Sequence, residues 1–134
     1  MCLLYRPGTD RCRSFAGEGL AEMLVHITRQ TQWDGVSGRE YRGDTLASEG
    51  FIHCSTRDQV VRVANARFHG ERGLVLLCIA PERVRAEIRY EAAENGERFP
   101  HVYGALNVDA VVQVLEFPPG ADGSFSVPAA LAGS

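Results

Sequence analysis

The chain has 134 residues, of which 45% are hydrophobic and 23% are charged, and its formal net charge is -3. This length and composition are typical of a single globular domain and exclude a disordered chain. The negative balance also argues against a protein that wraps a nucleic acid by bulk electrostatic attraction. All 14 basic side chains are arginine, which we attribute first to a GC-rich, bacterial coding bias.

Residues 1–22 show no clear periodicity, and the regular pattern begins at Met23. We expect Met23 to be the natural start, because the preceding Gly17–Gly19 is what a purine-rich ribosome-binding site encodes when it is translated in frame. The prediction is a disordered extension or misassigned start at 1–22, one domain at 23–128 and a frayed end at 129–134. No signal peptide or apolar run of membrane-spanning length is visible, so we expect a cytoplasmic protein without a membrane partner.

Apolar and polar residues alternate over 24–28, which predicts a half-buried strand. A short helix is expected over 29–35 and a loop over 41–44. Asp44 is the expected cap of a helical turn that Gly50 ends.

The clearest helix follows a predicted strand at 51–55. Ser55 and Thr56 offer caps, and Asp58 and Gln59 stand three residues on, which is the spacing of a capping box. Apolar residues then recur at helical intervals at Val60, Ala64 and Phe68, whereas Arg57, Arg62 and Arg67 are expected to face solvent.

Further strands are predicted over residues 74–80, 86–91, 110–117 and 124–127, with a turn or short strand over 99–104. The fully apolar segment at 74–80 suits a central strand. Together these elements predict an α+β domain with a small, split or twisted mixed β-sheet and a few short helices.

Polar groups stand where a simple core would need aliphatic ones. Strand alternation places His26 with Thr28, His53 with Ser55, and Glu91 with Arg89, each pair on one face of its strand. Buried groups of this kind are costly without partners, so we expect them to meet each other, water or a ligand. His101 and Tyr103, which flank Val102, join the same candidate site.

Simpler explanations compete with a functional site. A strand histidine is often a packing residue, Glu91 can form an ion pair with Arg89 or Arg98, and a structural turn explains His101 and Tyr103 as well.

Two other kinds of chemistry are disfavoured. A metal site would draw on His26, His53, Cys54, His101 or Glu91, but no short ligand pairing such as HExxH or CxxC is present, so we expect no metal. A Cys54 nucleophile is disfavoured because its side chain should point to the face opposite His53.

The segments Gly50–Ser55 (GFIHCS) and Phe99–Gly104 (FPHVYG), with Leu24–Thr28 and Arg89–Glu91, resemble a bacterial family catalogued as domain of unknown function 952. The resemblance covers about 23–127. That family is in turn similar to the ADP-ribosyltransferase superfamily, which includes RNA 2'-phosphotransferases that use NAD.

The resemblance implies NAD as cosubstrate, with His26 holding the NAD ribose and His53 near the nicotinamide. A third polar residue beside the scissile bond is implied, for which Glu91 competes with Gln113 and Glu116. Catalysis would then fall to His53 and Glu91, and binding to His26, Thr28, Ser55, Arg89, His101 and Tyr103. Arg29, Arg89 or Arg98 could neutralise a phosphate.

Three functions follow. The first is an NAD-using transferase whose acceptor is a protein, a small molecule or an RNA 2'-phosphate. The second is a module that binds a nucleotide or other small molecule without turnover. The third is a domain whose histidine cluster is structural.

Overall fold

The computed structural model describes residues 23–36, 38–43 and 45–132; the predicted extension at 1–22 and the predicted cap Asp44 lie outside them. The strands are β1 (Leu24–Arg29), β2 (Glu40–Tyr41), β3 (Ile52–His53), β4 (Ser55–Thr56), β5 (Leu74–Ile79), β6 (Glu87–Ala92), β7 (Arg98–Tyr103), β8 (Leu106–Asn107) and β9 (Val111–Glu116). The helices are α2 (Gln30–Asp34), α3 (Leu46–Glu49), α4 (Arg57–Arg67) and α5 (Ala129–Ala132), with 3-10 turns at Pro81–Arg83 and Val108–Ala110.

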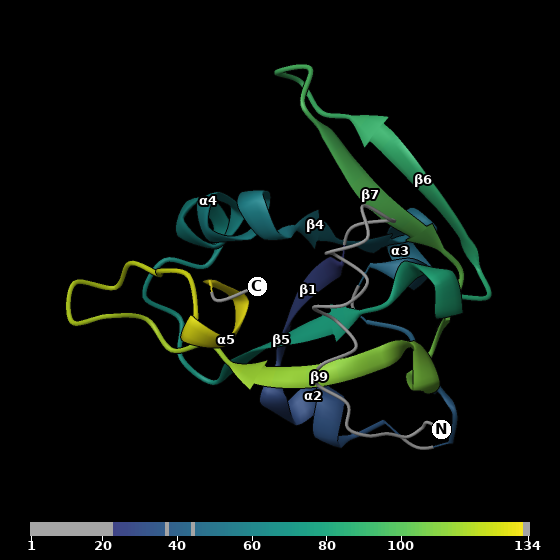
Figure 1. The fold of residues 1–134 in the computed structure, drawn as a ribbon, viewed down its shortest axis with the longest axis horizontal. Coiled ribbons are helices and arrows are strands. Elements are labelled where there is room, and N and C mark those ends of the chain that lie inside the picture. Colours follow the sequence, from purple (N-terminus) through teal and green to yellow (C-terminus); the bar gives the residue numbers. More distant parts are fainter. Residues whose placement is uncertain (1–22, 37, 44, 133–134) are drawn as a thin grey trace.

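The predicted α+β class is confirmed, but the sheets are antiparallel rather than mixed (Figure 1). One sheet has the order β4-β1-β5-β9, a second has β3-β7-β6, and β2 pairs with β8. β4 and β5 run in the same direction but lie on either side of β1, and each is antiparallel to it. The α4 crossover therefore connects strands that are not neighbours, which is why no parallel pair arises among the described strands.

β5 is one of the two inner strands of the large sheet, as its apolar sequence predicts, and all six of its residues are buried. Side chains on one face, such as Leu76, pack with Val60 and Ala64 of α4. Those on the other face, such as Leu77, pack beneath the two smaller sheets with Val102 and Leu106. The large sheet is thus covered on both faces, and its burial supplies most of the apolar driving force.

The predicted strand at 51–55 divides at Cys54. Ile52 and His53 pair with β7, whereas Ser55 pairs with Val25 of β1. The chain crosses between the two sheets at Cys54, whose main-chain N–H donates to the Pro100 carbonyl at 3.0 Å. His53 and Ser55 therefore belong to different sheets although only one residue separates them.

The β6–β7 hairpin projects from the domain and is bound to α4 near its tip (Figure 1). Gln59, buried in the first turn of α4, donates to Glu97 Oε2 at 3.1 Å and to the Arg98 carbonyl at 2.7 Å. Arg62 binds both Glu97 oxygens, at 3.1 and 2.6 Å. These contacts fix the hairpin over the space between α4 and the edge of β1.

The C-terminal segment differs from expectation. Residues 124–127 form no strand; Phe125 instead stacks on Phe117 with ring centroids 4.8 Å apart. Where fraying was predicted, Ala129–Ala132 forms α5 and Leu131 is buried. None of the helices in the described part of the chain has the length and apolar character needed to cross a membrane.

Candidate functional site

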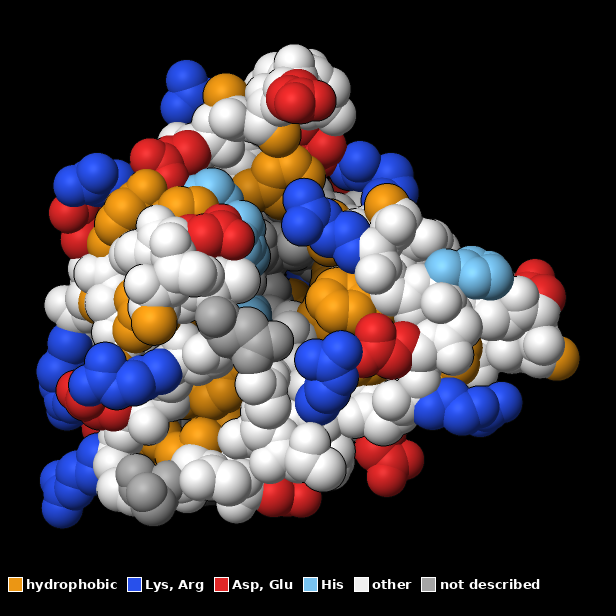
Figure 2. All heavy atoms as spheres, turned by 180° about the vertical axis from the view of Figure 1, so that it is seen from behind, with side chains coloured by type: hydrophobic (Ala, Val, Ile, Leu, Met, Phe, Trp, Pro, Cys, Tyr) orange, Lys and Arg blue, Asp and Glu red, His pale blue; other side chains and the backbone are white. Residues whose placement is uncertain are grey.

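A cavity of about 750 Å³ opens between the two larger sheets and α4. Among the described strands, β1 pairs with β4 only at Leu24 and Val25, so its edge from His26 onward is left to form a wall of this cavity. The end of α4 forms a second wall and the β6–β7 hairpin a third. Figure 2 shows the surface hollowed near its centre, with histidine side chains along one side of the hollow and arginines on the other.

His26 lines the cavity and is held at both ring nitrogens. Its Nδ1 donates to the main-chain carbonyl of His53 at 2.6 Å, and its Nε2 lies 2.8 Å from the Tyr41 hydroxyl. Because a carbonyl can only accept, Nδ1 carries a proton in either charge state of the ring. The ring is 9% exposed, so its orientation is fixed by these bonds and the surrounding packing.

A chain of hydroxyl groups continues from His26 along the cavity wall. The Tyr41 hydroxyl donates to Thr28 Oγ1 at 2.8 Å, and Thr28 donates to Gln32 Oε1 at 3.0 Å. Sequence analysis missed Tyr41, which was assigned to a loop but lies on β2 and is 2% exposed. A single aromatic residue among Arg42, Gly43 and other polar neighbours has no periodicity, so its residue type was the only available signal.

His53 also lines the cavity, on the strand that precedes the crossing at Cys54. Its Nε2 lies 2.8 Å from Oε1 of Glu49, a residue of α3 that sequence analysis did not single out. Its ring meets the His101 ring edge-on with centroids 5.1 Å apart. The Phe51 ring stacks on the His101 ring with centroids 4.2 Å apart and meets the His53 ring edge-on with centroids 4.7 Å apart. The two histidines therefore share one aromatic neighbour.

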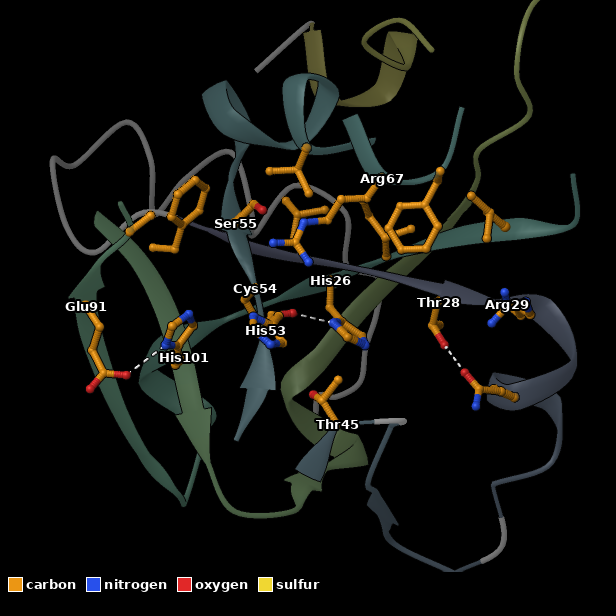
Figure 3. Close-up of a pocket in the computed structure, with 18 of the residues that line it drawn as sticks. His26, Thr28, Arg29, Thr45, His53, Cys54, Ser55, Arg67, Glu91 and His101 are labelled. Atoms are coloured by element: carbon orange, nitrogen blue, oxygen red, sulfur yellow. Dashed lines mark hydrogen bonds and ion pairs between the residues drawn. The ribbon is translucent and has the colours of Figure 1, made fainter. Parts of the chain in front are cut away.

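Glu91 is bound by both of the β7 residues predicted to share its site (Figure 3 draws the contact with His101). Its Oε1 accepts from the Tyr103 hydroxyl at 2.6 Å and lies 2.7 Å from His101 Nδ1. These hydrogen bonds, that of Tyr103 first, lower the pKa of the Glu91 carboxyl. The same bond raises the pKa of the Tyr103 phenol. Glu91 is therefore an ionised carboxylate at neutral pH.

Ser55 and Arg67 are among the polar residues of the cavity whose side chains have no partner among the described residues. Ser55 is 5% exposed, and its hydroxyl makes no hydrogen bond to any described group. Arg67, the last residue of α4, is exposed, as the helical pattern predicts, and its side chain also lines the cavity (Figure 3). Helical periodicity placed Arg67 on the exposed face of α4 but gave no sign that this residue borders a cavity.

Residues 27–114 match the family described as "Protein of unknown function (DUF952)". The chain belongs to the DUF952 family. The matched span contains the two most specific segments of the resemblance, Gly50–Ser55 and Phe99–Gly104, and begins within the segment Leu24–Thr28. The wider similarity to ADP-ribosyltransferases stays a prediction.

Solved structures similar to this DUF952 chain include those of the protein CC0527 from Caulobacter crescentus. Its crystal structure is 29% identical, covers 82% of this chain and 98% of that chain, and superposes with a TM-score of 0.75. Its solution NMR structure is 32% identical over 76% of this chain and 90% of that chain, with a TM-score of 0.66. No match was found among curated proteins.

The three arginines predicted to neutralise a phosphate in this DUF952 protein are each bound to another protein group, and two of them do not line the cavity. Arg89 pairs with Glu87 at 3.0 Å and its guanidinium carbon lies 4.5 Å from the Tyr103 ring centroid, outside the cavity wall. Arg98 donates to the Tyr90 carbonyl at 3.3 Å and does not line the cavity either. Arg29 does line it but is paired with Glu71 at 2.7 Å.

The alternatives for the third polar residue are separated by their strands. Gln113 and Glu116 lie on β9, at the far edge of the sheet from the cavity, with β5 between β9 and β1. Neither lines the cavity, whereas Glu91 does. Of the three candidates, only Glu91 shares a cavity with His26 and His53.

Cys54 is unsuited to nucleophilic chemistry. Its side chain is 3% exposed, and burial raises the pKa of its thiol to about 12. The thiolate is therefore scarce at neutral pH. Within the described residues, no three His, Cys, Asp or Glu side chains are grouped so that they could hold a metal ion.

Proposed function

We propose that this DUF952 protein is an NAD-using transferase of the ADP-ribosyltransferase type. One observation carries the proposal: an ionised carboxylate, Glu91, stands at the wall of a cavity that His26 and His53 also line. The volume of about 750 Å³ lies within the range of cavities that enclose small-molecule ligands. The Ser55 hydroxyl and the Arg67 guanidinium, for which no described residue is a partner, fit a ligand that carries both hydroxyl and phosphoryl groups.

Bound NAD would supply the glycosidic bond between its ribose and nicotinamide. Glu91 would stabilise the positive charge that develops on the ribose carbon as this bond breaks. Tyr103 and His101 would keep the carboxylate ionised and fix its direction through their hydrogen bonds to Oε1. A carboxylate that is already oriented needs little reorganisation in the transition state, which is the main source of such electrostatic catalysis.

His53 is suited to act as the general base. When its Nε2–H donates to Glu49, the neutral ring has an unprotonated Nδ1, for which no described residue is a donor. Nδ1 would receive the proton that the acceptor loses as a lone pair of the acceptor bonds to the ribose carbon. The electron pair of the broken bond leaves with nicotinamide. Glu49 thus has the orienting role that carboxylates have beside catalytic histidines.

His26 has a positioning role in this proposal. Both of its ring nitrogens are occupied by the His53 carbonyl and the Tyr41 hydroxyl. It would therefore hold the His53 backbone and the hydroxyl chain of Tyr41 and Thr28 in place, and these hydroxyls would contact the ribose. This differs from the direct ribose contact that the family resemblance implies.

The test is release of nicotinamide from NAD, with water as acceptor, measured for the wild-type protein, Glu91→Gln and Glu87→Gln. Glu87 is the matched control because it lies on the same strand but outside the cavity wall. We expect Glu91→Gln to lower kcat by about 100-fold or more and Glu87→Gln to leave it unchanged. Wild-type protein that neither binds nor cleaves NAD would refute the proposal.

The second candidate is a nucleotide-binding module without turnover. It is favoured by His26, whose ring nitrogens already bind protein groups and so have no hydrogen bond ready for a ligand. This candidate predicts that NAD raises the melting temperature without any release of nicotinamide. Release that depends on Glu91 would exclude it.

A further inference from the structure

Arg67 differs from the other arginines of α4 in having no side-chain partner among the described residues. Arg62 binds Glu97 through two nitrogens, and Arg57 donates to the Leu131 carbonyl at 3.5 Å. No described residue forms an ion pair or hydrogen bond with the Arg67 guanidinium. Its position at the helix C-terminus suits a cation in general, but that alone does not direct the side chain into a cavity.

Ser55 supplies a second and independent observation. Its main chain is used in the pairing of β4 with β1, but its hydroxyl lacks a partner among the described residues although it is 95% buried, since 5% of the residue is exposed. A buried hydroxyl without a hydrogen bond is unfavourable, because it has lost its hydration without gaining a partner. The residue lines the same cavity as Arg67, and Figure 3 shows the Arg67 guanidinium extending toward the side of Ser55 and His26.

The charges of the cavity are separated. Its carboxylates, Glu91 and Glu94, belong to the β6–β7 hairpin. Its guanidinium groups belong to the other two walls, Arg29 to β1 and Arg67 to α4. The charge of Arg29 is neutralised by its ion pair with Glu71. Arg67 is therefore the uncompensated positive charge of the described cavity wall. A ligand with an anionic part and a part that becomes cationic during the reaction would therefore bind in one orientation, with its anionic part beside Arg67 and the other part beside Glu91.

We infer that Arg67 and Ser55 form a phosphoryl-binding subsite, which receives the diphosphate of a nucleotide while its ribosyl carbon faces Glu91. The identity of the ligand rests on the proposed function; the preference for a phosphoryl group rests on these two side chains. The guanidinium offers two parallel N–H donors to phosphate oxygens, and the Ser55 hydroxyl offers a third donor. Arg67 thus sets the direction in which the ligand lies.

The experiment measures the affinity of inorganic pyrophosphate, ADP-ribose and nicotinamide by titration calorimetry. Arg67→Gln is compared with Arg72→Gln, which removes the same charge from a residue just beyond α4 that does not line the cavity. We expect Arg67→Gln to weaken pyrophosphate and ADP-ribose binding by about tenfold or more and to leave nicotinamide binding unchanged. Arg72→Gln should bind all three as the wild type does. Ser55→Ala, which shortens a buried side chain without adding bulk, should weaken pyrophosphate binding severalfold.

Failure of this inference is distinguishable from failure of the proposed function. If NAD is cleaved and Arg67→Gln has wild-type KM and pyrophosphate affinity, the subsite is refuted and the proposed function stands. If pyrophosphate binds through Arg67 but NAD is neither bound nor cleaved, the proposed function is refuted and the subsite stands. If wild-type protein binds none of the phosphorylated probes, both are refuted. Circular dichroism of each variant establishes that loss of binding is not loss of the fold.

Discussion

The Nδ1 atom of His26 lies 2.6 Å from the main-chain carbonyl oxygen of His53, so one candidate site histidine is anchored to the backbone of the other. The bond joins β1 of the large sheet to β3 of the second sheet, just before the chain crosses at Cys54. The His26 ring therefore influences the His53 ring through the His53 main chain, to which it is hydrogen-bonded. The first ring fixes the position of the second residue, while the second ring remains half-exposed at the cavity.

This relationship predicts unequal effects on stability. His26→Ala leaves the His53 carbonyl and the Tyr41 hydroxyl without their shared partner in a buried environment. We expect the free energy of unfolding to fall by about 3 kcal/mol. His53→Ala removes a ring whose side chain is 40% exposed and should cost less than about 1 kcal/mol. Urea denaturation of both variants measures the difference, and equal losses would contradict the anchoring role of His26.

We expect substitution of Glu49 to lower the rate of catalysis without lowering the stability of the fold. It lies on the short helix α3, and its side chain is 48% exposed. Glu49→Gln keeps the shape but removes the charge that fixes the tautomer of His53. If His53 is the base, kcat for nicotinamide release should fall by about tenfold or more while KM for NAD stays constant. Ser48→Ala, on the same helix, is the control; a change in KM alone would assign Glu49 to binding instead.

Much of the fold follows from local patterns in the sequence. The apolar segment at 74–80 predicted β5, and Thr56 with Gln59 predicted the start of α4, where Gln59 Oε1 accepts from the Thr56 main-chain N–H at 3.0 Å. These features depend on neighbours in the sequence, so periodicity and capping chemistry are enough to find them.

The site was only partly accessible from the sequence, because it is assembled from distant segments. Alternation drew attention to His26, His53 and Glu91, which all line the cavity, but it could not show that Cys54 separates two sheets. Tyr41 lies on a two-residue strand that exists only because Leu106 pairs with it. Arg67 lines the cavity together with the unpaired part of the β1 edge, an arrangement that depends on tertiary contacts and has no local signal.

We expect the Cys54 thiol to resist thiol reagents as long as the protein is folded. With a pKa of about 12, roughly one thiol in ten thousand is ionised at pH 8, and the side chain is 3% exposed. Native protein treated with iodoacetamide should remain unmodified at Cys54, and the same residue should react fully after denaturation in urea. Mass spectrometry of the peptide that contains Cys54 makes the comparison. Rapid native labelling would place the thiol in an exposed, activated environment and contradict its assignment to the core.

The ionisation of Glu97 should make the free energy of unfolding depend on pH. Hydrogen bonds and attraction from Arg62, with Gln59 and Asn95 contributing further hydrogen bonds, lower the pKa of the Glu97 carboxyl from 4.5 to about 2. Because the folded carboxyl binds a proton less readily than the unfolded one, its stabilising contribution is fully present above about pH 4.5. That contribution declines as the pH falls toward 2, where the folded carboxyl also becomes protonated.

The Glu97→Gln variant tests this dependence directly. It should unfold at a lower urea concentration than the wild type at pH 7, and the difference between the two should shrink at pH 3 because the wild-type contribution is then partly lost. Glu94→Gln, on the same hairpin and exposed, should follow the wild type at both pH values. Since Glu97 also holds the hairpin to α4, its loss should weaken ADP-ribose binding by releasing one wall of the cavity. A difference that stays constant from pH 7 to pH 3 would mean that the charge of Glu97 does not stabilise the hairpin contact.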